Sequence, residues 1–240
     1  MDWRRTLKLS LEKRAPGAMT VGRRLRALLW NALSNSVRTF RRIYLTNEWG
    51  NTESRSGPGS ASAATRSLRR SLPVLFAELG VRSIVDAPCG DFWFRHVDVE
   101  LDSYLGIDVV QELVERNQRE YGSSKRAFVK MDLTREVPPR ADLVLCRDLL
   151  IHLSYEHGRR VLRNFARSNS SWLLCSDFPE VPNTHDIPMG RWRAINLRAP
   201  PFGFPEPERV LEDDPPAGLS SGEAPRRTMG LWRLSDLPLY

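Results

Sequence analysis

Five short apolar segments, each ending at or beside an acidic residue, constrain the fold of this chain more than any other feature. They cover residues 83–87, 104–108, 127–131, 142–147 and 172–176, and helical patterns cover residues 65–80, 109–121 and 155–168. Strands that alternate with helices indicate βαβ units and a parallel sheet. Residues 208–211 and 228–234 are expected to add an antiparallel pair at one edge. The sequence therefore predicts an α/β fold with a Rossmann-like, open and mostly parallel sheet.

The first of these segments ends in the turn Asp86-Ala-Pro-Cys-Gly90. In an open α/β sheet, ligands bind in the crevice outside the carboxyl ends of the strands. Pro88 and Phe92 stand where the dinucleotide-binding fingerprint needs glycine, and the chain contains no P-loop sequence. The turn is therefore expected to hold a ligand without phosphates. S-adenosylmethionine fits, because its amino and sulfonium groups are cationic and an acid-rich turn attracts them.

Acidic residues also close the second and third segments. Asp108 follows the first turn by about twenty residues, and a carboxylate at that place can accept hydrogen bonds from both hydroxyls of a ribose. Asp132 can accept a hydrogen bond from an adenine amino group while Met131 or Leu133 packs against the ring. An ordinary turn explains Asp132 equally well.

The fourth segment runs into Arg147, Asp148 and His152. One interpretation is an ion pair between Arg147 and Asp148, with His152 as a core or helix-cap histidine. The alternative is that His152 or Asp148 takes a proton from the molecule that is modified, because imidazole titrates near neutral pH. The pattern leaves both interpretations open.

Together these segments resemble motifs I to IV of the class I S-adenosylmethionine-dependent methyltransferases, whose sheet is seven-stranded. More narrowly, the chain resembles a bacterial group of these enzymes over about residues 47–236. The shared segments are residues 53–60 (ESRSGPGS), 86–92 (DAPCGDF), 146–154 (CRDLLIHLS), 183–193 (NTHDIPMGRWR), 200–205 (PPFGFP) and 230–234 (GLWRL). The resemblance implies a fold and a cofactor, and no particular methyl acceptor.

The resemblance also implies roles for individual residues. The residues expected to bind S-adenosylmethionine are Asp86, Pro88, Cys89, Gly90, Asp91, Asp108, Asp132, Leu133 and Arg147. The residues expected to face the acceptor are His152, as general base for a hydroxyl, and Asp148. The residues expected at the acceptor side of the crevice are Trp93, Asp186, Trp192 and Arg193. Simple packing of the Pro-rich tail is the alternative for Trp192 and Arg193, and a core position is the alternative for Trp93.

The net charge of +7 is concentrated at the start of the chain, where residues 1–50 hold 11 Lys or Arg against 3 Asp or Glu. From Thr20 to about Tyr44 the apolar residues follow helical spacing, which predicts a basic amphipathic helix. Its apolar face is expected either to pack on the body of the protein or to lie on an anionic membrane surface. Nucleic acid is the other anionic partner that such an arm would suit.

The expected division of the chain has three parts: a basic helical arm at residues 1–49, a Gly/Ser-rich linker or lid at 50–64, and a methyltransferase domain at 65–240. Within this domain, residues 178–216 form a Pro-rich insertion on the substrate side. Three cysteines without CxxC spacing indicate reduced thiols and a cytoplasmic protein, peripheral to the membrane if the arm binds lipid. We expect no structural metal, because the histidines lack ligand spacing, and no transmembrane segment.

The sequence therefore predicts a methyltransferase that acts on an oxygen or nitrogen atom of a small molecule or glycan. An RNA methyltransferase is the first alternative, because the arm is basic. The NPPY-type motif common in base N-methyltransferases is absent, and CRDL stands in its place. The second alternative is a non-catalytic scaffold that binds S-adenosylmethionine. The retained acids at the strand ends argue against this alternative.

Overall fold

The computed structural model describes residues 35–216, 218 and 224–238. The strands are β1 (Ser83–Asp86), β2 (Ser103–Asp108), β3 (Arg126–Lys130), β4 (Leu143–Cys146), β5 (Trp172–Asp177), β6 (Arg209–Asp213) and β7 (Arg227–Arg233). The helices are α3 (Ser36–Thr46), α4 (Arg66–Leu79), α5 (Gln111–Tyr121) and α6 (Tyr155–Arg167). Most of the predicted basic arm falls on residues 1–34, outside the described residues, so its anionic partner stays a prediction.

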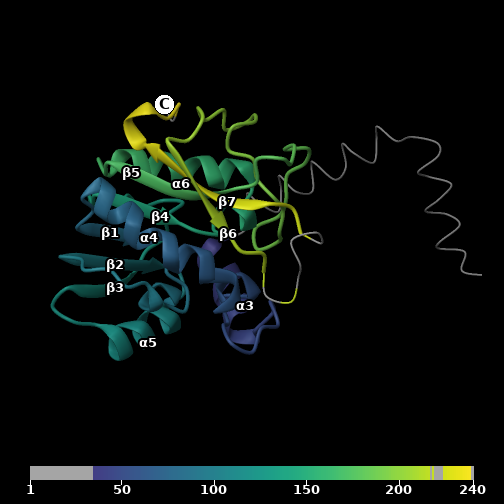
Figure 1. Cartoon of the computed structure of the whole chain (residues 1–240). Coiled ribbons are helices and arrows are strands. Elements are labelled where there is room, and N and C mark those ends of the chain that lie inside the picture. Colours follow the sequence, from purple (N-terminus) through teal and green to yellow (C-terminus); the bar gives the residue numbers. More distant parts are fainter. Residues whose placement is uncertain (1–34, 217, 219–223, 239–240) are drawn as a thin grey trace, which may run out of the picture.

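The strands form one sheet in the order β3-β2-β1-β4-β5-β7-β6 (Figure 1). Strands β1 to β5 pair in parallel, and β7 runs antiparallel between β5 and β6. The predicted α/β class and the antiparallel edge pair are confirmed. The strand order reverses at β1, which lies between β2 and β4. In sheets of this kind the crevice at the reversal point is where ligands bind.

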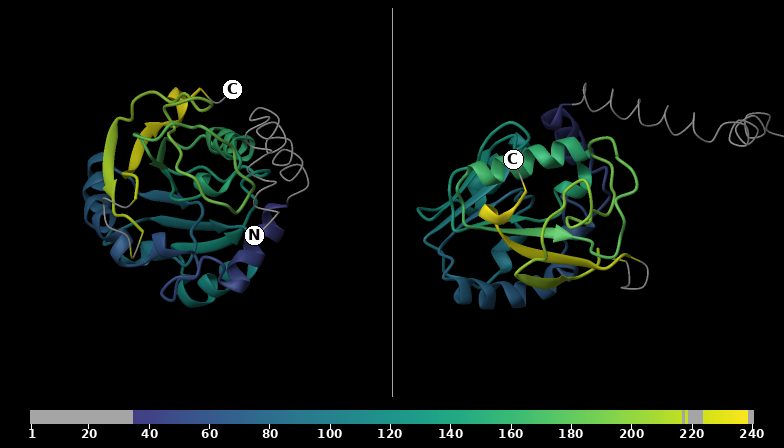
Figure 2. Two further views of the ribbon diagram at one scale, coloured as in Figure 1. Left: turned by 90° about the vertical axis from the view of Figure 1, so that its right-hand side faces the viewer. Right: turned by 90° about the horizontal axis from the view of Figure 1, so that it is seen from above.

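Helices cover both faces of the sheet, with α4 on one face and α6 on the other (Figure 2). Leu68 and Leu72 of α4 share a core cluster with Leu113 and Val114 of α5. Val161 and other residues of α6 belong to a second cluster, which also takes in apolar side chains of the Pro-rich insertion. The sheet is therefore buried on both faces, which suits its nearly continuous apolar strands.

Helix α3 and the residues after it form a separate element beyond the carboxyl ends of the strands (Figure 1). Asn35 caps α3 by accepting a hydrogen bond from the backbone N–H of Arg38, and Asn47 ends the helix in the left-handed conformation. Asparagine is favoured at both positions. We call residues 35–60 the cover segment, because its side chains line the site described below.

Within the described ranges, no helix is long and apolar enough to cross a membrane. The same part of the chain holds no group of three or more His, Cys, Asp or Glu side chains placed to bind a metal ion. The three cysteines are buried and unpaired.

Candidate active site

One cavity of about 310 Å³ lies at the carboxyl ends of the strands, next to the reversal point. Of the residues expected from the sequence, it is lined by Pro88, Cys89, Gly90, Trp93, Asp108, Asp132, Leu133, Arg147, Asp148, His152 and Trp192. The cavity brings most of the expected site residues together. Asp86, Asp91, Asp186 and Arg193 do not line it, and the contacts of each explain why.

Asp86 lies beneath the cavity rather than in its wall. Its carboxylate is fully buried and accepts a hydrogen bond from the Tyr104 hydroxyl at 2.6 Å, while its Oδ1 has no partner among the residues that the structure describes. Side chains alternate along a strand, so Asp86 shares the face of Ile84, which packs into the α4–α5 cluster. Burial raises the pKa of Asp86 to about 7, the Tyr104 hydrogen bond opposing this rise.

Replacing Asp86 by asparagine is expected to flatten the pH dependence of stability. The pKa of this carboxyl is about 7 in the folded protein against a usual 3.8, so the folded state holds the proton more tightly. The unfolding free energy therefore falls as pH rises from about 4 to about 7. Urea unfolding at about pH 5 and pH 8 should show that wild type loses about 2 kcal/mol more over that interval than Asp86→Asn. Equal losses would contradict the assignment.

The Asp91 carboxylate is engaged by other protein groups and does not line the cavity. It pairs with Arg116 at 2.5 Å and accepts hydrogen bonds from the Ser54 hydroxyl at 2.8 Å and the Ser56 N–H at 3.1 Å. Burial would raise the pKa of Asp91, but the hydrogen bonds from Arg116 and Ser54 outweigh burial and lower it. Asp91 therefore fastens the cover segment to the turn after β1.

Asp108 places a buried carboxylate on the cavity wall. It accepts the N–H of Val110 at 3.0 Å and the N–H of Gly90 at 3.3 Å. Burial raises its pKa to about 6, although these backbone donors oppose the rise. Gly90 has φ +49, and a Cβ there would meet Ser56 Oγ at 2.7 Å. Within the described residues only backbone N–H groups donate to Asp108, so its carboxylate could also accept hydrogen bonds from ribose hydroxyls.

Asp132 is already engaged by protein donors. Its Oδ1 accepts hydrogen bonds from the N–H and hydroxyl of Thr134, at 3.0 and 2.7 Å. Its Oδ2 accepts the hydroxyl of Ser36, the first residue of α3, at 2.5 Å. Asp132 lines the cavity, but its clearest contact ties the start of the cover segment to the end of β3.

The cover segment supplies a wall that the sequence indicated only in part. Phe40, Tyr44 and Trp49 line the cavity from this side, as does the turn at 55–60. The amphipathic pattern at residues 20–44 and the lid interpretation of residues 50–64 each indicated part of this wall. Trp49 lay between these two segments and was not singled out.

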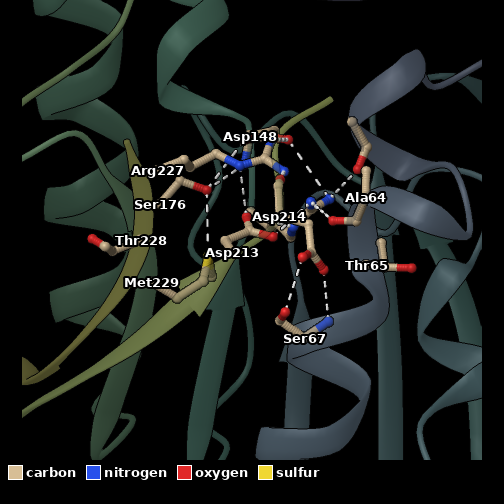
Figure 3. Close-up of polar contacts among 12 residues, drawn as sticks. Ala64, Thr65, Ser67, Asp148, Ser176, Asp213, Asp214, Arg227, Thr228 and Met229 are labelled. Carbon is tan, nitrogen blue, oxygen red and sulfur yellow. Dashed lines mark hydrogen bonds and ion pairs between the residues drawn. The ribbon is translucent and has the colours of Figure 1, made fainter. Parts of the chain in front are cut away.

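Asp148 lies in a buried network of two arginines and two aspartates (Figure 3). Arg227 pairs with Asp148 at 2.8 Å and with Asp213 at 2.9 Å, and Arg147 contacts Asp213 through two nitrogens at 3.0 Å each. Burial would raise the pKa of Asp148, but Arg227 and then Arg147 outweigh burial and lower it. A carboxylate held in this way is a weak proton acceptor.

The same network holds the cover segment against the sheet. Arg147 donates to the carbonyl oxygen of Gly59 at 2.7 Å and to that of Ala64 at 3.0 Å. A Cβ at Gly59 would lie 2.7 Å from Asp148 Oδ2, so a larger residue there would have to displace the Asp148 carboxylate. Sequence reasoning missed Asp213 and Arg227, because they lie on the antiparallel strands β6 and β7, far along the chain, and carry no local motif.

His152 ends a short 3-10 turn, Leu150–His152, that follows β4. Its Nδ1 lies 3.0 Å from the carbonyl oxygen of Arg191, and its ring stacks on Trp49 with ring centroids 4.6 Å apart. A carbonyl oxygen can only accept, so Nδ1 carries the proton and Nε2 keeps its lone pair, with no hydrogen-bond partner among the described residues. Partial burial of the ring lowers the pKa of His152, which favours the neutral imidazole.

The remaining expected residues divide between the cavity mouth and the packing of the insertion. Trp192 is 52% exposed and packs edge-on against Phe178. Arg193 is buried, and donates to the carbonyl oxygen of Leu153 at 2.6 Å. Asp186 accepts the N–H of Tyr155 at 2.9 Å. Asp186 and Arg193 therefore hold the Pro-rich insertion against the start of α6.

Trp93 lines the cavity beside Arg147. The guanidinium of Arg147 sits 5.3 Å from its ring centroid, and only 6% of the residue is exposed. Its indole therefore supports Arg147 and leaves a small edge facing the cavity.

The fold is that of class I S-adenosylmethionine-dependent methyltransferases. The N-methyltransferase NodS of Bradyrhizobium japonicum WM9, solved with S-adenosylhomocysteine, superposes with a TM-score of 0.57 at 15% identity, over 82% of this chain and 98% of that one. Magnesium protoporphyrin IX methyltransferase of Synechocystis PCC 6803, also with S-adenosylhomocysteine, gives 0.52 at 16% identity, over 87% and 98%. The methyltransferase domain of bacterial CtHen1-C gives 0.51 at 13%, over 71% and 98%.

In sequence, no family model matches the chain and no curated protein matches it significantly. The likeness therefore lies in the fold.

Proposed function

We propose that this protein is an S-adenosylmethionine-dependent methyltransferase that acts on a hydroxyl oxygen or a nitrogen of a small molecule or glycan. The observation that carries the proposal is the placement of Asp108 and Gly90 on one cavity at the reversal point of the sheet. Solved proteins of this fold bind S-adenosylhomocysteine. A likeness of fold raises the expectation of an activity, and the site has to support it independently.

The residues present suit the cofactor. Asp108 offers two ribose hydroxyls a buried carboxylate, to which only backbone N–H groups donate within the described part of the chain, and Gly90 lets the backbone come close. Met131 and Leu133 give the apolar surface that an adenine ring requires. Pro88 and Cys89 would line the methionine part. When bound, the cofactor supplies an electrophilic methyl group on its sulfonium.

The protein's own contribution is to orient the acceptor, exclude water and accept a proton. The cover segment closes one side of the cavity with apolar rings, which limits access of water. Nε2 of His152 is the group able to take a proton, since Asp148 is held by two arginines. Asp148 would instead help to orient the acceptor. A base of this kind matters most for a hydroxyl acceptor.

Replacing His152 by alanine is expected to lower methyl transfer by about 10²–10⁴-fold, the usual contribution of a general base. Affinity for S-adenosylhomocysteine should change by less than about threefold, because the contacts of Asp108 and Gly90 stay intact. The assay follows label from methyl-labelled S-adenosylmethionine into hydroxylated and amine-bearing small molecules and glycans.

Full turnover in His152→Ala would remove the base assignment. Label that appears only in RNA would favour the alternative of an RNA methyltransferase. Cofactor binding without transfer to any acceptor would favour the scaffold.

A further inference from the structure

We propose that Trp49 is a positioning residue, which holds His152 in one tautomer and one ring orientation and does so only when the cover segment is seated. The inference rests on the proposed function in that it gives His152 the task of accepting a proton. It adds a residue outside the sequence motifs, placed on a part of the chain distant from β4.

Trp49 is held from several sides. Its ring stacks on that of His152 with an interplanar angle of 26°, and Phe40 of α3 lies 6.5 Å from it, centroid to centroid. Gly57 backs the indole: a Cβ there would lie 3.4 Å from Trp49 Cε3, and the glycine has φ +96. An aromatic ring fixed in this way presents a flat, rigid surface to its neighbour.

His152 in turn has two constraints. The carbonyl of Arg191 fixes its Nδ1 at 3.0 Å, and the Trp49 face fixes the plane of its ring. A hydrogen bond alone would allow the ring to swing about it, and a stack alone would allow the ring to flip. Together they direct Nε2 in one direction with its lone pair free.

The charged groups that act on this ring come from two other elements. Asp148, two residues after β4, favours the protonated imidazole, and Arg193 of the Pro-rich insertion opposes it. Burial is the largest influence and favours the neutral ring. Trp49 supplies one face of that burial, so its removal admits water to the ring and restores the ordinary protonation behaviour.

The cover segment is fixed at the other end of the cavity as well. Ser36 donates to Asp132, and Arg41 of α3 donates to Glu112 of α5 through Nε at 2.6 Å. Ser54 and Ser56 bind Asp91. The segment that contacts the predicted adenine end therefore also delivers Trp49 to His152, so the candidate base is fully oriented only when the cavity is covered.

The experiment is ring-nitrogen NMR of histidine in the full chain, with the His152 signals assigned through His152→Gln. Wild type should show the tautomer with hydrogen on Nδ1 and a pKa below the usual value for histidine. In Trp49→Ala the pKa should rise by about half a unit or more and the tautomers should mix. Trp49→Phe should retain most of the wild-type behaviour, because it keeps a flat ring.

Leu45→Ala is the matched control, since Leu45 is exposed on α3 and 44% of it is accessible. The proposal is overturned if Trp49→Ala leaves the tautomer and pKa unchanged, or if Leu45→Ala alters them equally. Should Trp49→Ala fail to fold, Trp49→Leu gives the same comparison with Trp49→Phe.

Titration with S-adenosylhomocysteine separates this proposal from the proposed function. Wild type that shows no binding, while Trp49→Ala still changes His152, would remove the methyltransferase assignment and leave the positioning role in place.

Discussion

Replacing Asp108 by alanine is expected to weaken binding of S-adenosylhomocysteine by about a hundredfold or more. A hydrogen bond to a charged group contributes about 1.5–3 kcal/mol, and two ribose hydroxyls are available to donate. The carboxylate lies in a buried wall of the cavity, where water would not replace those contacts. Calorimetric titration of the two proteins at one pH above 7 measures the change, because the pKa of about 6 leaves Asp108 ionised there.

The matched control is Asp102→Ala, at an exposed ion pair with Arg82 immediately before the same strand. It should leave the affinity within about twofold, because exposed pairs contribute little. An Asp108→Ala protein that binds as tightly as wild type would show that this carboxylate does not hold the ribose.

Replacing Asp213 by alanine is expected to destabilise the protein by about 3–5 kcal/mol. The carboxylate is completely buried and pairs with both Arg147 and Arg227, whose side chains are 2% and 4% exposed. The network then keeps both buried guanidinium groups but only one carboxylate, that of Asp148, to pair with them (Figure 3). Breaking a buried pair by removing one partner costs this much, because the other charge stays uncompensated. Urea unfolding measures the loss.

Glu212→Ala is the control for that substitution. Glu212 precedes Asp213 on β6 and pairs with Arg226 at the surface, with side chains 64% and 47% exposed. It should change the unfolding free energy by no more than about 1 kcal/mol. If Asp213→Ala were as stable as Glu212→Ala, the network would not hold the strands and the cover segment together.

The fold was predictable because its signals are local. Each of β1 to β5 is a short apolar run bounded by polar residues, and the helical segments between them have helical spacing of apolar residues. The strand ends of a parallel sheet meet at one edge, so Asp108 could be assigned to the cavity from its place in the sequence alone. The antiparallel pair of β6 and β7 could be assigned from two short segments, residues 208–211 and 228–234, on either side of a Gly/Pro-rich loop.

Asp86 was harder because its strand is buried on both faces. In such a strand apolar residues occur at successive positions, so the pattern does not reveal which side chain faces which layer. The structure directs Asp86 toward Tyr104 and away from the cavity. The position of Asp91 was hard to predict for another reason. Its partners Ser54 and Arg116 belong to different segments of the chain, and a sequence motif does not reveal contacts with distant residues.

The buried charge network and the Trp49 stack could not be predicted from spacing. Arg147 meets Asp213, and Trp49 meets His152, only after the sheet and the cover segment have come together. Contacts between residues so far apart in the sequence depend on the complete fold. Each partner taken singly resembles an ordinary surface or core residue.

The most direct test of the central claim is titration of S-adenosylhomocysteine into the full-length protein by calorimetry. The expected result is saturable binding at one site per chain, with an affinity in the micromolar range that falls as pH drops through about 6 and Asp108 gains its proton. No heat of binding at millimolar S-adenosylhomocysteine, in protein shown to be folded, would contradict the assignment of this cavity to a methyl-donor cofactor.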